Sequence, residues 1–257
     1  MNLLEYKLGR GVRAFSTRRD TCGDAGGGTY SSFNITHYCG DAPEHVTECR
    51  KELCAELGID DERLILPRQT HTDNVFVLDR KYFEVFPELR SRVLEEQDAV
   101  VTREKGVCIG VSTADCVPVL MYDAEAEVIA AVHAGWRGMV KRIPQKALAE
   151  MVKLGADPRR VKVAVGPSIG PESFEVGEEV VDAFLDEGFH PCILSRQWAK
   201  PHIDLWQACD MQLEDAGVSL RNIQFAGVDT FVRHDEFFSA RRLGIKSGRI
   251  FSGIMLK

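Results

Sequence analysis

The stretch GVSTADCVPVLMYDAEAEVIAAVHAGWRG, residues 110–138, decides how the centre of this chain folds. Two apolar runs, 117–122 and 128–133, flank the short polar segment 123–126. Apolar runs of this length around a polar turn are typical of two antiparallel strands joined as a hairpin. We therefore predict that residues 117–133 form a buried hairpin.

The register of this hairpin brings two metal-binding residue types together. If Tyr122 pairs with Glu127, stepping outward along both strands places Cys116 opposite His133. Residues directly opposed across antiparallel strands have Cβ atoms ~4.5–5.5 Å apart. A thiolate and an imidazole at that separation reach one zinc ion without strain.

A third ligand comes from elsewhere in the sequence, and His71 in the polar segment PRQTHTDNV is the best candidate. Three protein ligands leave a fourth position open, which is the arrangement of catalytic rather than structural zinc sites. The residues alone leave other readings open. His71 could be an ordinary loop histidine, Cys116 a buried structural thiol, and the group a metal-free polar cluster.

The rest of the pattern mixes strands and helices. Further β-type runs lie at 12–16, 64–66, 75–78, 99–102, 107–112, 161–165 and 223–227. Helical periodicity marks 43–57, 143–154, 177–187 and 205–216. The runs between 64 and 133 suggest one sheet, with helices on either side. This order predicts an α/β sandwich with mixed sheets rather than a regular βαβ repeat.

Length and composition limit the class of protein. At 257 residues, 44% hydrophobic and 28% charged, the chain suits one folded domain spanning 1–257. A net charge of −7 argues against a general nucleic-acid or membrane-surface binder. The eight cysteines form no CxxC pair, and no leader or membrane span is recognisable. We expect a cytoplasmic protein with reduced thiols. We also expect a long loop at 17–36, and loops of this length are usually functional or disordered.

Eight motifs follow one another along most of the chain. They are FSTRR at 15–19, NITHYCGD at 34–41, RQTHTDNV at 68–75, QDAVVT at 97–102, STADCVP at 112–118, VHAGWRG at 132–138, GPSIGPESFEVG at 166–177 and FFSARRLGIKSGR at 237–249. In these motifs the sequence resembles the bacterial laccase-domain family, described as polyphenol oxidase or purine nucleoside phosphorylase and also as peptidoglycan editing factor.

This resemblance implies a fold, an activity and a metal. The implied fold is a four-layer α-β-β-α sandwich similar to the catalytic domain of cytotoxic necrotizing factor. The implied reaction is phosphorolysis of adenosine, inosine and methylthioadenosine to free base and ribose 1-phosphate, with adenosine deamination as a second activity. The family's ligands fall on His71, Cys116 and His133, with zinc as the expected metal and copper suggested by the family label.

Purine nucleosides and phosphate would then be the partners, and other motif residues acquire expected roles. Asp115 and Glu175 are candidates to transfer protons during deamination. Arg18 and Arg137 are candidates to hold phosphate, since a guanidinium binds it in a bidentate manner. Residues expected to hydrogen-bond ribose or base are Asn34, His37, Gln69 and Asp98. The basic run Arg241, Arg242, Lys246 and Arg249 could assist with phosphate or form a solvated edge.

Several alternatives remain open at this stage. Cys116 could be a nucleophile with His133 as its base, as in a metal-free cysteine amidase. Editing of a UDP-muropeptide cell-wall precursor is a second enzymatic alternative, and a zinc-binding interaction module is the non-enzymatic one. A true multicopper laccase is disfavoured because the chain has seven histidines and no HxH pair. The H-x-E and P-C-x-x-C signature of cytidine deaminases is absent as well.

Overall fold

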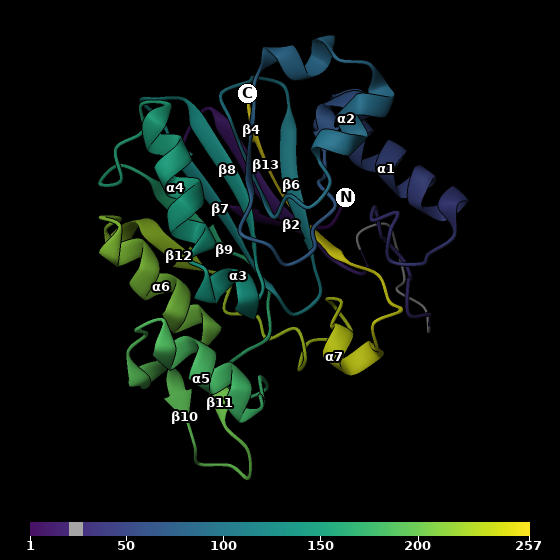
Figure 1. The fold of residues 1–257 in the computed structure, drawn as a ribbon. Coiled ribbons are helices and arrows are strands. Elements are labelled where there is room, and N and C mark those ends of the chain that lie inside the picture. Colours follow the sequence, from purple (N-terminus) through teal and green to yellow (C-terminus); the bar gives the residue numbers. More distant parts are fainter. Residues whose placement is uncertain (21–27) are drawn as a thin grey trace.

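The computed structural model describes residues 1–20 and 28–257, and its largest features are two mixed β-sheets (Figure 1). In the five-stranded sheet, β3 and β6 are parallel and the other neighbours are antiparallel. Its strands, in spatial order, are β1 (Leu3–Tyr6), β2 (Val12–Thr17), β13 (Ile250–Leu256), β6 (Cys108–Thr113) and β3 (Leu64–Ile65).

The six-stranded sheet contains the central hairpin. Its outer pairs, β12 with β9 and β4 with β5, are parallel, and the inner pairs are antiparallel. In spatial order the strands are β12 (Ile223–Phe225), β9 (Lys162–Val165), β7 (Val117–Asp123), β8 (Val128–Ala134), β5 (Ala99–Thr102) and β4 (Val75–Leu78). A separate small ladder joins β10 (Leu194–Ser195) to β11 (His202–Ile203).

The two large sheets pack against each other through alternate residues of their strands. Leu120 of β7 and Ile129 of β8 lie in one apolar cluster with Ile109 of β6 and Ile254 of β13. Side chains alternate between the faces of a strand. The remaining hairpin residues, such as Val119, therefore enter the cluster on the opposite face.

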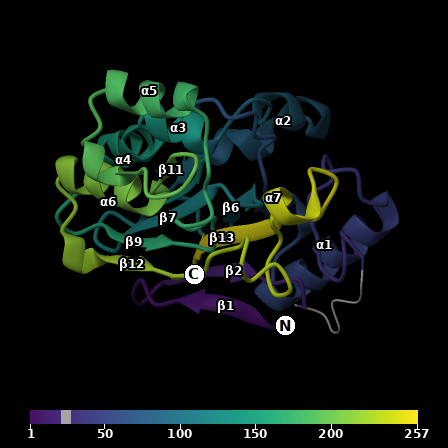
Figure 2. The same ribbon diagram turned by 90° about the horizontal axis from the view of Figure 1, so that it is seen from below.

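Helices cover the outer faces of the sheets. The six-stranded sheet is covered by α3 (Trp136–Val140), α4 (Ile143–Lys153), α5 (Glu178–Asp186) and α6 (Leu205–Asp215). Figure 2 shows these helices on one side of that sheet and β1, β2 and β13 on its other side. Helix α1 (Pro43–Leu57) packs on the outer face of the five-stranded sheet, where Leu53 contacts the cluster containing Phe15 and Phe251.

The remaining elements are short. They are α2 (Pro87–Val93), α7 (Ala240–Leu243) and the 3-10 helices η1 (Asp61–Arg63), η2 (Arg80–Glu84), η3 (Pro191–Ile193) and η4 (Leu220–Asn222). No helix within residues 1–20 and 28–257 is long and apolar enough to span a bilayer. Part of the predicted loop at 17–36, residues 21–27, lies outside the described residues.

The prediction of a mixed α/β fold is confirmed, but two details of the central prediction are wrong. The runs between 64 and 133 do not form one sheet, since β3 and β6 belong to the five-stranded sheet. The hairpin register is also shifted, because His133 pairs with Pro118 rather than with Cys116.

The register differs because of the turn between β7 and β8. The side chain of Asp123 accepts hydrogen bonds from the backbone N–H groups of Glu125 and Ala126, at 2.9 and 3.2 Å, and Glu127 adopts a positive φ of 49°. Glu127 therefore belongs to the turn. The shift is two residues, from Cys116 to Pro118 as the partner of His133. Because side chains alternate between faces with a period of two, such a shift preserves the face on which each side chain lies. Cys116 and His133 are therefore diagonal neighbours on the same face.

Candidate metal centre

Three side chains with metal-binding atoms converge where β7 begins and β8 ends. The ligand atoms of His71, Cys116 and His133 all lie within 4.8 Å of one another, and Cys116 Sγ is 3.7 Å from His71 Nε2. Zinc bonds to sulfur and nitrogen place two donor atoms roughly 3.6 Å apart in a tetrahedral site. Two imidazoles and a thiol therefore fit a zinc or copper ion in both chemistry and spacing.

Asp98 organises two of these ligands from behind. Its carboxylate is fully buried immediately before β5, where Oδ1 accepts hydrogen bonds from His133 Nδ1 at 2.6 Å and from the backbone N–H of His71 at 3.0 Å. Oδ2 accepts from the backbone N–H of Thr72 at 2.8 Å and from its hydroxyl at 2.7 Å. With Nδ1 of His133 bound to a carboxylate, Nε2 is left to bind a metal.

The same contacts control protonation. Burial raises the pKa of Asp98, but the hydrogen bonds from His133 and Thr72 outweigh it and bring the pKa to about 2. Burial likewise raises the pKa of Cys116, yet His133 and then His71 lower it to about 6. Cys116 is therefore largely a thiolate at neutral pH, which is the form that binds metals.

Gly135 leaves the space that the three donors need. A Cβ atom at this position would lie 2.7 Å from Cδ2 of His71 and 3.0 Å from Sγ of Cys116. Real Cβ atoms essentially never lie within 3.0 Å of another side chain, and a contact at 3.0 Å is already tight. Any larger residue at position 135 would therefore push the side chains of His71 and Cys116 aside.

The three donors open into a cavity of about 470 Å³. Gln69 lines it in a fixed orientation, since its Oε1 accepts from the N–H of Ser112 at 2.8 Å and its Nε2 donates to the carbonyl of Ser112 at 2.7 Å. The remaining lining residues are Tyr38, Cys39, Thr113, Ala114, Ala240, Ile245, Lys246 and Arg249. A cavity of this volume is in the range of small-molecule sites.

The cavity carries cations close to the candidate metal donors. Lys246 and Arg249 belong to the basic run recognised in the sequence, whereas Arg241 and Arg242 are absent from the lining. Arg249 is held in place, because it donates to the carbonyls of Ser247 at 2.6 Å and Ile245 at 2.9 Å. An anionic group of a ligand would meet positive charge in this cavity.

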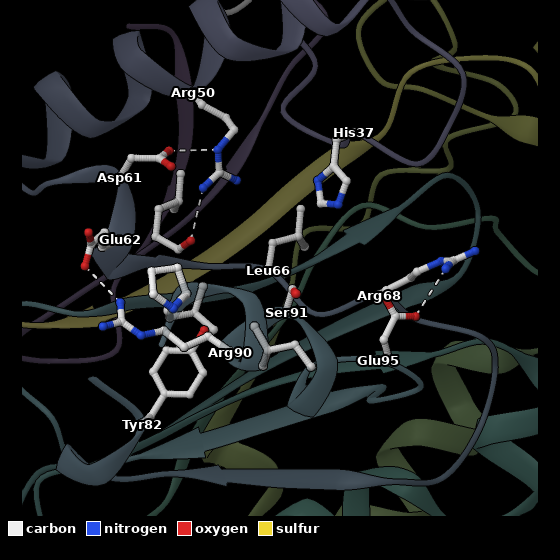
Figure 3. A pocket seen from close by; sticks show the side chains of 14 residues that line it. His37, Arg50, Asp61, Glu62, Leu66, Arg68, Tyr82, Arg90, Ser91 and Glu95 are labelled. Atoms are coloured by element: carbon white, nitrogen blue, oxygen red, sulfur yellow. Dashed lines mark hydrogen bonds and ion pairs between the residues drawn. The ribbon is translucent and has the colours of Figure 1, made fainter. Parts of the chain in front are cut away.

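Among the residues expected to contact ribose or base, only Gln69 lines this cavity. Asp98 lies behind the metal donors. Asn34 is fully buried, where it donates to Asp41 at 2.8 Å and accepts from the backbone N–H of Arg249 at 3.2 Å. His37 lines a different cavity (Figure 3).

The expected proton-transfer residues also lie outside the lining. Asp115 has a positive φ of 92°, and its carboxylate accepts from the hydroxyl of Thr230 at 2.8 Å and from the backbone N–H of Arg241 at 2.7 Å. It thereby ties the start of α7 to the loop that carries Cys116. Glu175 is exposed and forms an ion pair with Lys200 at 2.7 Å.

The two expected phosphate ligands do not line the cavity either. Arg18 forms an ion pair with Glu236 at 2.9 Å and lies over the ring of Phe237. Arg137 is exposed, with its guanidinium 4.2 Å from the ring centre of Trp136. Sequence reasoning missed Tyr38, Ser112 and Thr113 as lining residues. Their only signal was a place inside the motifs NITHYCGD and STADCVP.

The chain matches the family model described as multi-copper polyphenol oxidoreductase laccase over residues 12–257. The chain belongs to this laccase family. A related protein, a purine nucleoside phosphorylase of Bacteroides thetaiotaomicron, is 45% identical to this chain over 94% of this chain and 90% of its own length. Adenosine deaminase RL5 from an unknown prokaryotic organism is 43% identical over 96% of this chain and 95% of its own length.

Solved structures show the same fold. YlmD from Geobacillus stearothermophilus superimposes with a TM-score of 0.87 at 26% identity, covering 98% of this chain and 94% of that one. The Neisseria meningitidis protein NMB0706 superimposes with a TM-score of 0.84 at 28% identity over the whole of both chains. The laccase-family assignment therefore agrees in sequence and in fold.

Proposed function

We propose that this chain is a metal-dependent purine nucleoside phosphorylase. It would convert adenosine, inosine and methylthioadenosine with phosphate into the free base and ribose 1-phosphate, and deaminate adenosine as a second activity. The observation that carries the proposal is a three-donor site of His71, Cys116 and His133 that opens into a cavity containing Lys246 and Arg249. The names of its relatives support the reaction class.

Zinc is the metal we propose, because imidazole and thiolate donors in this number match a catalytic zinc site. A zinc ion bound to these donors supplies Lewis-acid chemistry. Copper, which the family description names, is the alternative occupant. The donor set alone suits both metals.

The chain's own residues would position the two substrates. Lys246 and Arg249 would hold phosphate and stabilise its charge as the glycosidic bond breaks. Ile245 and Ala114 would provide an apolar surface for the base. Burial raises the pKa of Tyr38 to about 12, so its hydroxyl stays protonated at neutral pH. The side chain of Gln69, held by Ser112, would help to fix the orientation of the ligand.

The proposal assigns different tasks to the other expected residues. Asp98 and Asp115 act by positioning, the first on the metal donors and the second on the loop beside Cys116. The residues Arg18, Asn34, His37, Arg137 and Glu175 make contacts elsewhere, so we assign them no direct contact with substrate.

We also propose that residues 1–257 form one domain with a four-layer α-β-β-α arrangement similar to cytotoxic necrotizing factor. Helices on the outer faces of two packed sheets support this description. A cytoplasmic location is part of the proposal. It is supported by free thiols at all seven cysteines within the described residues.

A second candidate function is a cysteine amidase, including one that edits a UDP-muropeptide. The observation that favours it is the arrangement of Cys116, His133 and Asp98. The pKa of Cys116 is lowered to about 6, and His133 is hydrogen-bonded to a buried carboxylate. In a catalytic triad, a nucleophile is hydrogen-bonded to a base, and the base is hydrogen-bonded to a carboxylate that orients it. Cys116, His133 and Asp98 would fill these three roles.

Chromatographic product analysis separates the two candidates. Purified protein is incubated with adenosine, with and without phosphate, and compared with Cys116→Ala and Lys246→Gln. The phosphorylase proposal requires adenine and ribose 1-phosphate only when phosphate is present, with loss in Cys116→Ala. Absence of nucleoside turnover, together with amide cleavage by the wild type, would favour the amidase.

A further inference from the structure

A second cavity, of about 300 Å³, shares no lining residue with the metal-site cavity. It lies between α1 and η1 on one side and η2 and α2 on the other (Figure 3). The side chains of Leu66, Tyr82 and Leu94 give it an apolar interior, and each is less than a tenth exposed. Its volume is at the lower end of the range for small-molecule sites.

Two backbone segments separate the cavities. His37 lines the second cavity while its neighbour Tyr38 lines the metal-site cavity, and Arg68 and Gln69 are divided in the same way. The two segments contact each other, since the hydroxyl of Tyr38 donates to Oε1 of Gln69 at 3.3 Å. The second cavity is therefore a neighbour of the metal site but not a part of it.

The guanidinium of Arg50 lines this cavity, while the carboxylate of its ion-pair partner Asp61 is mostly exposed to solvent. The arginine side chain is 18% exposed, while that of its partner Asp61 is 64% exposed. Nε of Arg50 donates to Asp61 at 2.8 Å and Nη2 to the carbonyl of Leu64 at 3.3 Å. Nη1 makes no hydrogen bond to any residue of 1–20 or 28–257 and lies on the side nearer His37 (Figure 3).

The other two arginines of the cavity are already occupied. All three donor groups of Arg90 are used, with Nε on the carbonyl of Val85, Nη2 on that of Phe83 and Nη1 on Glu62. Arg68 is 57% exposed and paired with Glu95 at 3.2 Å. One guanidinium nitrogen, Nη1 of Arg50, is therefore available, which suits a ligand with a single negative charge better than a phosphate dianion.

The pKa of His37 is lowered by its surroundings in the cavity. Burial lowers its pKa, and the charges of Arg50 and Arg68 lower it further, against the opposing effect of Glu95. The ring is therefore neutral at pH 7 and offers a hydrogen bond without a second charge. A ligand carboxylate could also take the place of Asp61, because an ion pair with so exposed a carboxylate contributes little stability.

We propose that this cavity binds a small aromatic monocarboxylate. The aromatic ring packs against Leu66, Tyr82 and Leu94, and the carboxylate accepts hydrogen bonds from Arg50 and His37. The binding requires neither the candidate metal ligands nor the proposed phosphorylase reaction.

Calorimetric titration of the full chain with 1-naphthoate tests the proposal. We expect saturable binding of one naphthoate molecule per chain. The neutral analogue 1-naphthamide should bind the wild type at least ~10-fold more weakly, because a hydrogen bond to a charged group is lost. Naphthoate should bind Arg50→Gln at least ~10-fold more weakly for the same reason. Ser91→Phe, which fills the cavity from its exposed side, should also prevent binding while keeping Arg50. Arg196→Gln, which removes a distant surface pair with Glu178, should bind like the wild type.

Three results would overturn the proposal. The first is that the wild type gives no saturable heat with 1-naphthoate. The second is that folded Ser91→Phe binds naphthoate with the affinity of the wild type. The third is that Cys116→Ala no longer binds naphthoate, which would place the anion at the metal site. Because Cys116→Ala disables the proposed phosphorylase but should retain naphthoate binding, failure of the catalytic proposal can be distinguished from failure of this one. Circular dichroism of each variant confirms that it is folded.

Discussion

The carboxylate of Asp98 lies 2.6 Å from Nδ1 of His133 and is fully buried behind it. The same carboxylate accepts backbone hydrogen bonds from Thr70, His71 and Thr72. One side chain thus orients a strand ligand and fixes the loop that carries a second ligand. Hydrogen-bond partners of metal ligands orient those ligands, and their replacement commonly lowers metal affinity.

Replacement of Asp98 should therefore weaken metal binding. In Asp98→Asn the amide group offers one acceptor oxygen to several donors, and we expect zinc affinity to fall by roughly 10- to 100-fold. Zinc titration against a competing chelator measures this. Asp73→Asn is the matched control, because that carboxylate pairs with Lys141 and Lys146 at the surface. Equal affinity in wild type and Asp98→Asn would contradict the positioning role of Asp98.

Gly135→Ala should remove the metal while leaving the fold intact. The new methyl group would meet His71 at 2.7 Å and Cys116 at 3.0 Å, so both donors must move. Gly188→Ala is the control, since its φ is 76° but nothing lies within 4 Å of its Cβ position; it should cost about 1 kcal/mol of stability and retain the metal. Metal content by mass spectrometry and thermal unfolding distinguish the two variants.

Metal affinity should depend on pH through Cys116. The pKa of this thiol is lowered to about 6, and the metal binds the deprotonated form. The metal also displaces a proton from His133, because burial lowers the pKa of this imidazole but Cys116 and Asp98 raise it to about 9. Affinity should therefore fall by about tenfold per pH unit between pH 8 and pH 7, and more steeply below pH 6, where the sulfur is protonated as well. Competition titrations across this range test the slope. A profile that becomes no steeper below pH 6 would mean that the thiolate is not a ligand.

Local features of the fold can be predicted from the sequence more accurately than features that depend on distant residues. Helix α1 was predicted with its observed bounds because Pro43 begins it and Gly58 ends it in a left-handed conformation with φ of 67°. Strands β4 and β5 also had their predicted bounds. The mixed α/β class followed from such local patterns.

Other features depend on contacts between distant residues. The hairpin register was predicted wrongly because it is set by side-chain hydrogen bonds of Asp123 within the turn, which hydrophobic periodicity does not reveal. The grouping of His71 with Cys116 was predicted, but its cause, the buried Asp98, was assigned to substrate binding. Lys246 and Arg249 reach the cavity through an irregular segment after α7, whose path no periodic pattern specifies.

Asp123 should also contribute to stability in a pH-dependent manner. Burial raises its pKa, but hydrogen bonds from the backbone N–H groups of Asp157, Ala126 and Glu125 and from Arg160 lower it overall from 3.8. A carboxyl group with a depressed pKa stabilises the fold above its ordinary pKa, and this stability is lost as the pH falls through the folded value. The contribution should therefore be complete at pH 7 and decline below pH 3.8.

Asp123→Asn should lower the free energy of unfolding at pH 7 by about 1–3 kcal/mol, because buried donors lose a charged acceptor. The difference from wild type should shrink as the solution is acidified. Glu125→Gln in the same turn is the control, as its carboxylate is 71% exposed. Urea unfolding at several pH values measures both. A stability difference that grows in acid would contradict a depressed pKa of Asp123 in the folded protein.

Lys246→Gln should raise the KM for phosphate by about tenfold or more, since one charged contact to the anion is removed. The KM for the nucleoside and the zinc content should change little. Lys153→Gln serves as a control, because that lysine pairs with Glu150 on the surface of α4. An unchanged phosphate KM in Lys246→Gln would remove this lysine from the proposed phosphate site.

Removal and return of the metal tests the central claim most directly. The protein is stripped with a chelator, adenine release from adenosine and phosphate is measured, and zinc is added back in known amounts. We predict that turnover disappears with the metal and returns in full at one zinc ion per chain, but does not return in Cys116→Ala. Undiminished adenine release by verified metal-free protein would contradict the proposed metal dependence.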